Sequence, residues 1–174
     1  ARAEGADVEI VRAAALLHDI GLDEGRAGHE TSAANRARDI LREHGYAEPF
    51  IAAVAHAIES HRFRSGPAPR TLEAKVLFDA DKLDSIGAIG VARAYAFGGH
   101  RRQKLWADVP PDYVDAGDDQ AGASQHTAVH EYHVKLKLIK DRLHTASGRA
   151  LAEERHAFMV RFYEQLDREM KGEA

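Results

Sequence analysis

The chain has 174 residues, of which 44% are hydrophobic and 30% are charged, so its length suits one domain with a single core. Its net charge is −4, and this lack of a basic excess argues against nucleic acid and anionic membranes as partners. The absence of cysteine excludes disulfides and thiolate metal sites, and favours a cytoplasmic location. No apolar run approaches the roughly 18 residues of a spanning helix, so we expect no membrane span.

The spacing of apolar residues predicts helices almost throughout the chain. No segment alternates with period two for long enough to predict a strand. We therefore predict an all-α fold, a compact helical bundle, with residues 1–174 as one domain. Asp7 is expected to N-cap the first helix, which closes near Gly21, and His18 leans from it toward the core.

Two further helices are predicted in the first half of the chain. One runs from residue 31 or 32 to His44. The next begins at Glu48, just before a proline, because proline is favoured at the first helical position. The apolar stripe of this third helix carries His61, so we expect that side chain to project with the apolar face.

A long fourth helix is predicted from Thr71 to the residue before Gly98. Residues 98–124 are rich in Gly, Pro and Asp and lack periodicity, so we expect a long loop excursion there. Two packing helices follow, over 129–143 and around 159–170.

The pair His18-Asp19 is unusual because it stands where an apolar helix ends. Burying an unpaired carboxylate costs several kcal/mol unless a positive charge compensates it. His61 on the third helix and Asp79 or Asp81 on the fourth are further polar groups beside apolar ones. Imidazole and carboxylate ligands together suit a divalent ion such as Mn, Fe, Zn, Ni or Mg, which would provide that charge.

Two alternatives stay open at this point. Asp79 and Asp81 both have apolar residues at helix-neighbour spacing, so at least one should turn inward, and periodicity does not choose between them. His61 taken alone could be an ordinary core histidine. The convergence of three helices on polar residues argues against a purely structural role for the whole set.

The chain resembles the HD superfamily of metal-dependent phosphohydrolases, specifically its small bacterial single-domain members. Two motifs carry the resemblance, LLHDIG at 16–21 and DADKLDSIGAIGVARA at 79–94. The likeness extends through HETSAANRARDIL, VAHAIESHRF and YHVKLKLIKDRLHTASGRALAEERHAFM. It thus covers most of the chain outside 100–125 and implies a helical bundle of the HD-domain type.

The resemblance implies a ligand set for the metal. In that family a histidine on an earlier helix, the His-Asp pair and a later aspartate hold the ion, which carries over to His18, Asp19 and Asp81. His29 and His61 fall where related binuclear members place further histidines, so they could bind a second ion or face substrate phosphate.

The chain departs from the family pattern because no histidine precedes His18. Either the sequence starts late or the protein lacks one ligand. The second case favours an alternative function, a catalytically weak or inactive HD-type module that binds a nucleotide for regulation.

The activity implied by the resemblance is hydrolysis of a phosphoester or phosphoanhydride bond. The expected substrate is a nucleotide or another small phosphorylated metabolite, and the expected cofactor is a divalent metal ion that activates water. Asp23 is our candidate for proton transfer, with Lys82 and Arg62 as candidate phosphate-binding cations.

Overall fold

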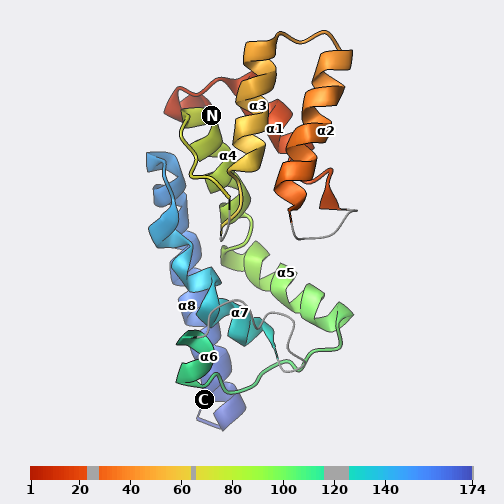
Figure 1. Cartoon of the computed structure of the whole chain (residues 1–174). Helices are drawn as coiled ribbons and strands as arrows, with labels where there is room; N and C mark the ends of the chain where they lie inside the picture. The colour runs from red at the N-terminus through yellow and green to blue at the C-terminus, as the bar shows by residue number, and fades with distance from the viewer. Residues whose placement is uncertain (23–27, 64–65, 116–125, 174) are drawn as a thin grey trace. The chain divides into compact units, whose positions relative to one another are not determined.

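The protein is all-α, as the sequence predicts. The computed structural model describes residues 1–22, 28–63, 66–115 and 126–173. Within these ranges the chain forms eight α-helices and short 3-10 turns and contains no strand (Figure 1). None of the helices in the described part is both long and apolar enough to cross a membrane.

The chain divides into two compact units. The first comprises residues 1–82 together with 143–148, and the second comprises 83–142 together with 149–174. The organisation of residues 1–174 as one domain stays a prediction.

The first unit begins with a short 3-10 turn and helix α1, Val8–Leu17. The side chain of Asp7 accepts hydrogen bonds from the amides of Glu9 at 2.8 Å and Ile10 at 3.2 Å. These two bonds confirm the predicted N-cap, since they satisfy amides that have no partner inside the helix.

Three more helices belong to this unit: α2, His29–Glu43; α3, Glu48–Glu59; and α4, Leu72–Leu83. The unit includes α4 up to residue 82. Helix α3 starts where predicted, with proline in its first turn. Helix α2 starts two or three residues earlier than predicted, after Gly28 in the left-handed conformation. That earlier start makes His29 the first residue of the helix.

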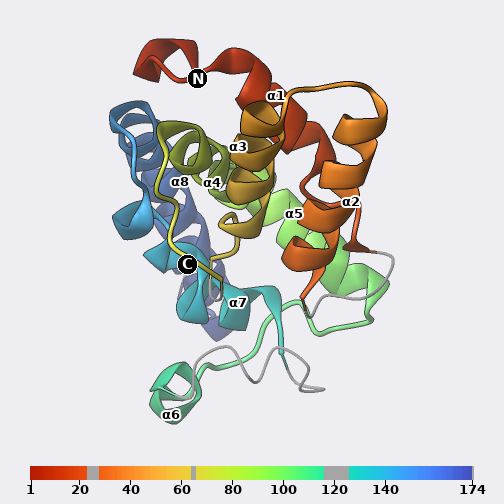
Figure 2. The same ribbon diagram turned by 45° about the horizontal axis from the view of Figure 1, so that its top comes forward.

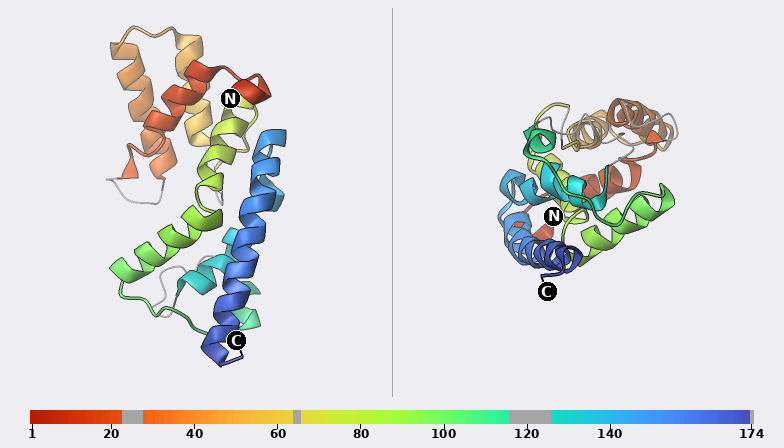
Figure 3. Two further views of the ribbon diagram at one scale, coloured as in Figure 1. Left: turned by 180° about the vertical axis from the view of Figure 1, so that it is seen from behind. Right: turned by 90° about the horizontal axis from the view of Figure 1, so that it is seen from below.

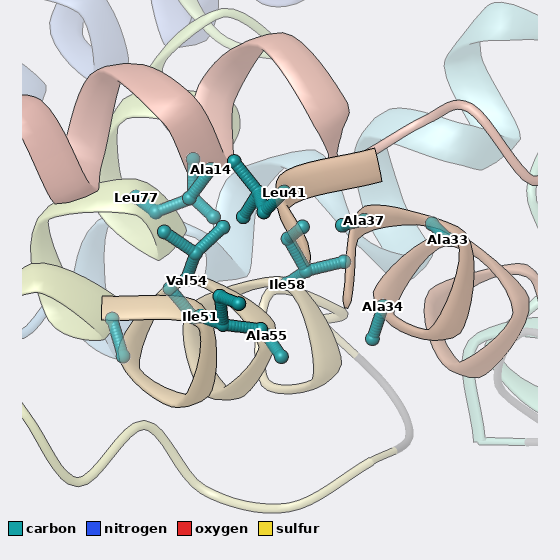
Figure 4. Packing of buried hydrophobic residues seen from close by; sticks show 12 residues of the cluster. Ala14, Ala33, Ala34, Ala37, Leu41, Ile51, Val54, Ala55, Ile58 and Leu77 are labelled. Atoms are coloured by element: carbon teal, nitrogen blue, oxygen red, sulfur yellow. The ribbon is translucent and has the colours of Figure 1, made fainter. Parts of the chain in front are cut away.

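The core of the first unit lies between α1, α2, α3 and α4. Helices α1 and α2 both lie against α3 (Figure 2). Alanines on α1 and α2 let the helices approach closely, and branched side chains from α3 fill the space between them (Figure 4). The cluster consists of Ala14, Ala33, Ala34, Ala37, Leu41, Ile51, Val54, Ala55, Ala57, Ile58, Ala74 and Leu77. This packing fixes the ends of α1, α2 and α3.

The second unit contains α5, Gly87–His100; α6, Pro111–Asp115; α7, Ala128–Val134; and most of α8, Ala146–Lys171. Helix α8 is the long helix that ends near the C-terminus in Figure 3. The segment predicted as a loop excursion is therefore partly helical, since it includes the end of α5 and all of α6.

The prediction of one helix from Thr71 to before Gly98 is wrong. The chain leaves the helix after Leu83 and enters α5 at Gly87, whose φ is +76°, a conformation that costs glycine little. The helix predicted over 129–143 is also shorter, because Lys135 has a non-helical φ of −141° and two 3-10 turns follow it.

We expect the packing of α3 to set the stability of the first unit. Ile58→Ala removes a fully buried side chain and should lower the free energy of unfolding by about 2–5 kcal/mol. Ile40→Ala makes the same change on α2 at a side chain that is 37% exposed, and should cost less than about 1 kcal/mol. Urea unfolding measures both, and equal losses would contradict the packing described here.

Candidate metal centre

The His-Asp pair stands at the point where α1 ends. His18 is the C-terminal cap residue, and its Nδ1 lies 2.8 Å from the carbonyl oxygen of Ala15. A carbonyl only accepts hydrogen bonds, so Nδ1 carries the proton in a neutral ring and Nε2 has a lone pair. That Nε2 lies 3.2 Å from Asp19 Oδ2. An imidazole lone pair and a carboxylate oxygen thus face one another, in a place where the Asp19 side chain is 48% exposed and open to water.

His61 follows α3 and is 3% exposed. Its Nδ1 donates to the carbonyl of Ile58 at 2.6 Å, which again leaves a lone pair on Nε2. Burial lowers the pKa of His61 below its usual 6.5 and outweighs the Ile58 carbonyl and Asp81, which act to raise it. The ring is therefore neutral at pH 7, which is the form that binds metals.

His29 completes a group of three imidazoles. Its Nε2 lies 3.6 Å from Asp19 Oδ1, and its ring centroid is 5.3 Å from that of His61. The rings of His18 and His61 are 5.2 Å apart. Asp19, His29 and His61 each offer a ligand atom, and these three atoms lie within 4.8 Å of one another. Imidazole nitrogens and a carboxylate at this spacing suit a divalent ion.

A close backbone contact brings His29 to the His-Asp pair. Gly21 is buried, and a Cβ there would lie 2.7 Å from the carbonyl oxygen of His29 and 2.8 Å from the amide nitrogen of Ala33. Only glycine lets the turn after Asp19 approach the first turn of α2 this closely. The glycine of the LLHDIG motif therefore helps to bring two segments of the site together.

The structure distinguishes the two aspartates that periodicity left open. Asp79 is 2% exposed and accepts hydrogen bonds from the segment before α8, at residues 144 and 145. Asp81 instead forms an ion pair with Lys82. Burial acts to raise the pKa of Asp81, but Lys82, His61 and His18 outweigh it, so the pKa is lowered. Asp81 thus carries negative charge in the field of two of the histidines.

Both predicted phosphate-binding cations have carboxylate partners. Lys82 is paired with Asp81, and its ammonium lies 5.5 Å above the ring of Phe78. Arg62 follows His61 directly, and its Nη1 lies 3.2 Å from Glu30 Oε2. The candidate for proton transfer, Asp23, lies outside the described residues.

Glu30 is a residue of this region that the sequence analysis missed. It is 8% exposed, and its Oε2 lies 3.5 Å from Nδ1 of His29 as well as close to Arg62. The signal was present, because a carboxylate directly after a candidate ligand histidine can orient that histidine.

Comparisons with known proteins identify related chains. The family model for the HD domain matches residues 1–86. The uncharacterized protein YpgQ of Bacillus subtilis is 35% identical over 173 residues, which cover 97% of this chain and 76% of YpgQ.

Two solved structures are also similar. The crystal structure of YpgQ in complex with ADP has a TM-score of 0.74 and 32% identity, and the match covers 99% of this chain and 82% of that one. An HD-superfamily hydrolase from Bacillus thuringiensis has a TM-score of 0.71 and 29% identity, with 98% and 78% covered.

The contact at Gly21 generates a prediction. Gly21→Ala forces α2 away from the His-Asp turn and should lower the free energy of unfolding by about 1–3 kcal/mol. It should also shift the NMR signals of the His29 ring. Gly99→Ala places the same methyl group in α5, where nothing lies within 4 Å, and should be neutral or stabilise by up to about 1 kcal/mol. An unchanged His29 spectrum in Gly21→Ala would contradict this account.

Proposed function

We propose that this chain, which belongs to the HD superfamily, is a metal-dependent phosphohydrolase. Hydrolysis as the reaction class is supported by two similar proteins, the HD-superfamily hydrolase from Bacillus thuringiensis and a predicted HD-superfamily hydrolase from an uncultured Thermotogales bacterium. The observation that carries the proposal is the meeting of three imidazoles with Asp19, in which the Nε2 lone pair of His18 faces a carboxylate.

The proposed ligands are His18, Asp19 and Asp81, with His29 and His61 as further ligands or as groups that face phosphate. The donor set fits a divalent ion because it combines neutral imidazoles with carboxylates. The Ala15 and Ile58 carbonyls support this role for His18 and His61, since each fixes the ring with Nδ1 protonated.

A bound Mn, Ni, Fe, Mg or Zn ion would supply a water molecule of lowered pKa and would polarise the phosphoryl group. Lys82 and Arg62 are our proposed phosphate-binding residues. Each would exchange part of its contact with Asp81 or Glu30 for a phosphate oxygen. Asp23 is our proposed proton-transfer group because it follows Asp19 by four positions in the sequence.

The proposed substrate is a nucleotide or another small phosphorylated metabolite. The ADP complex of YpgQ supports a nucleotide, since YpgQ matches this chain over most of both lengths. A phosphoester or phosphoanhydride bond is the proposed site of cleavage.

Metal supplementation tests the function directly. The protein is freed of metal with EDTA, and Mn²⁺ or Ni²⁺ is then added during a screen of nucleoside mono-, di- and triphosphates and sugar phosphates. We expect release of phosphate or pyrophosphate that depends on the added metal. Tight nucleotide binding with no release under either metal would overturn hydrolysis in favour of a binding module.

Variants test the ligand assignment. His61→Ala and Asp81→Asn should each weaken Mn²⁺ affinity by at least about 10–100-fold, as measured by the free Mn²⁺ signal in electron paramagnetic resonance. His44→Ala is the matched control, since His44 is exposed and its Nδ1 also contacts a carbonyl, that of Ile40 at 2.8 Å. If both site variants kept wild-type affinity and turnover, the assignment would be wrong.

A further inference from the structure

Asp79 makes an unusually complete set of hydrogen bonds for a helix-borne aspartate. Its Oδ1 accepts from the amide of His144 at 2.9 Å, and its Oδ2 accepts from the amide of Thr145 at 2.7 Å. The hydroxyl of Thr145 donates to the same Oδ2 at 2.6 Å. A carboxylate that is 2% exposed needs such partners, because each unsatisfied bond of a buried charge is costly.

The partners of Asp79 lie at the start of α8. Thr145 immediately precedes this helix, and its Oγ1 accepts the amide of Gly148 at 3.0 Å while its hydroxyl donates to Asp79. Thr145 is thus an N-cap that is itself held by the aspartate. The negative charge of Asp79 also lies at the end of the helix where the dipole favours it.

Asp79 and the start of α8 are packed too closely for either to shift toward the other. A Cβ on Gly148 would lie 3.0 Å from Asp79 Cγ and 2.8 Å from Thr145 Oγ1. The approach of α4 to the start of α8 is therefore as close as a residue without a side chain allows. His144 adds a ring contact to Phe78, with the centroids 5.0 Å apart. Phe78 and Asp79, which are consecutive in α4, thus both contact the segment just before α8.

Helix geometry connects Asp79 to the metal centre. Successive residues turn by about 100° around a helix, so residues two apart point in nearly opposite directions. Asp79 binds residues 144 and 145 on one side of α4, so Asp81, a proposed metal ligand, points to the other side. Fixing the rotation of the helix at Asp79 therefore fixes the direction of Asp81.

We propose that Asp79 is a positioning residue for the metal centre: by binding His144 and Thr145 it holds the rotation of α4 that directs Asp81 into the proposed site. This role rests on the proposed function, because it concerns the same metal site. Asp79 is not itself a proposed ligand and acts only through Asp81.

The test compares Mn²⁺ affinity in variants of the full chain. Asp79→Asn removes the charge, and Thr145→Val removes one bond to Asp79 with little change in shape. We expect both to weaken Mn²⁺ binding about 10-fold or more, as loss of groups that orient metal ligands does. Thr145→Ser keeps the hydroxyl and should bind Mn²⁺ with nearly wild-type affinity.

A matched control separates positioning from general destabilisation. Thr127 is also a buried N-cap threonine, 1% exposed, whose Oγ1 accepts the amide of His130 at the start of α7 in the second unit. Thr127→Val should lower the thermal midpoint of unfolding without changing Mn²⁺ affinity. Amide hydrogen exchange at residues 144 and 145 should accelerate in Asp79→Asn.

The outcomes are distinct. If the wild type binds Mn²⁺ and Thr145→Val and Asp79→Asn bind it equally well, the positioning role is overturned and the proposed function stands. An equal loss of affinity in Thr127→Val would also overturn the role, because it would trace the effect to stability. If the wild type itself does not bind Mn²⁺, the proposed function fails, and this inference fails with it.

Discussion

A carboxylate oxygen and an imidazole lone pair repel one another at close range, and a cation bound between them removes this repulsion. This constraint governs the region around His18 and Asp19. The carbonyls at the ends of α1 and α3 hold the rings of His18 and His61 so that their Nε2 atoms are acceptors. Backbone carbonyls at the ends of these two helices thus leave two imidazole lone pairs that a cation can bind.

The scaffold explains why these groups meet although they are far apart in the chain. Small residues on α1 and α2 allow close packing against α3, and the packed helices end near one another. The turn at Gly21 then adds the first residue of α2. The cations of the region are arranged in pairs with carboxylates, Lys82 with Asp81 and Arg62 with Glu30, so no described charge of this set is left without a partner.

Much of this could be predicted from the sequence, where local rules apply. The N-cap at Asp7 and the start of α3 at Glu48 follow from capping and proline preferences. The break after Leu83 could not be predicted from periodicity, because apolar spacing continues through it and the break depends on backbone angles at Gly87. The surroundings of Asp79 and Asp81 differ because Asp79 binds amides 65 and 66 residues away, whereas Asp81 pairs with the neighbouring Lys82. Spacing within one helix contains no information on either.

The first turn of α8 has a consequence for how the chain folds. The amides of residues 144 and 145, just before it, are bound by Asp79, 65 and 66 residues earlier, and the amide of Ser147 is bound by Glu4 Oε1 across 143 residues. Contacts this distant in sequence carry a large loop-closure entropy and form late when chain topology limits the rate. The start of α8 should therefore become ordered only after α4 and the N-terminal segment have come together with it, and folding should be slower than for a bundle held by local contacts.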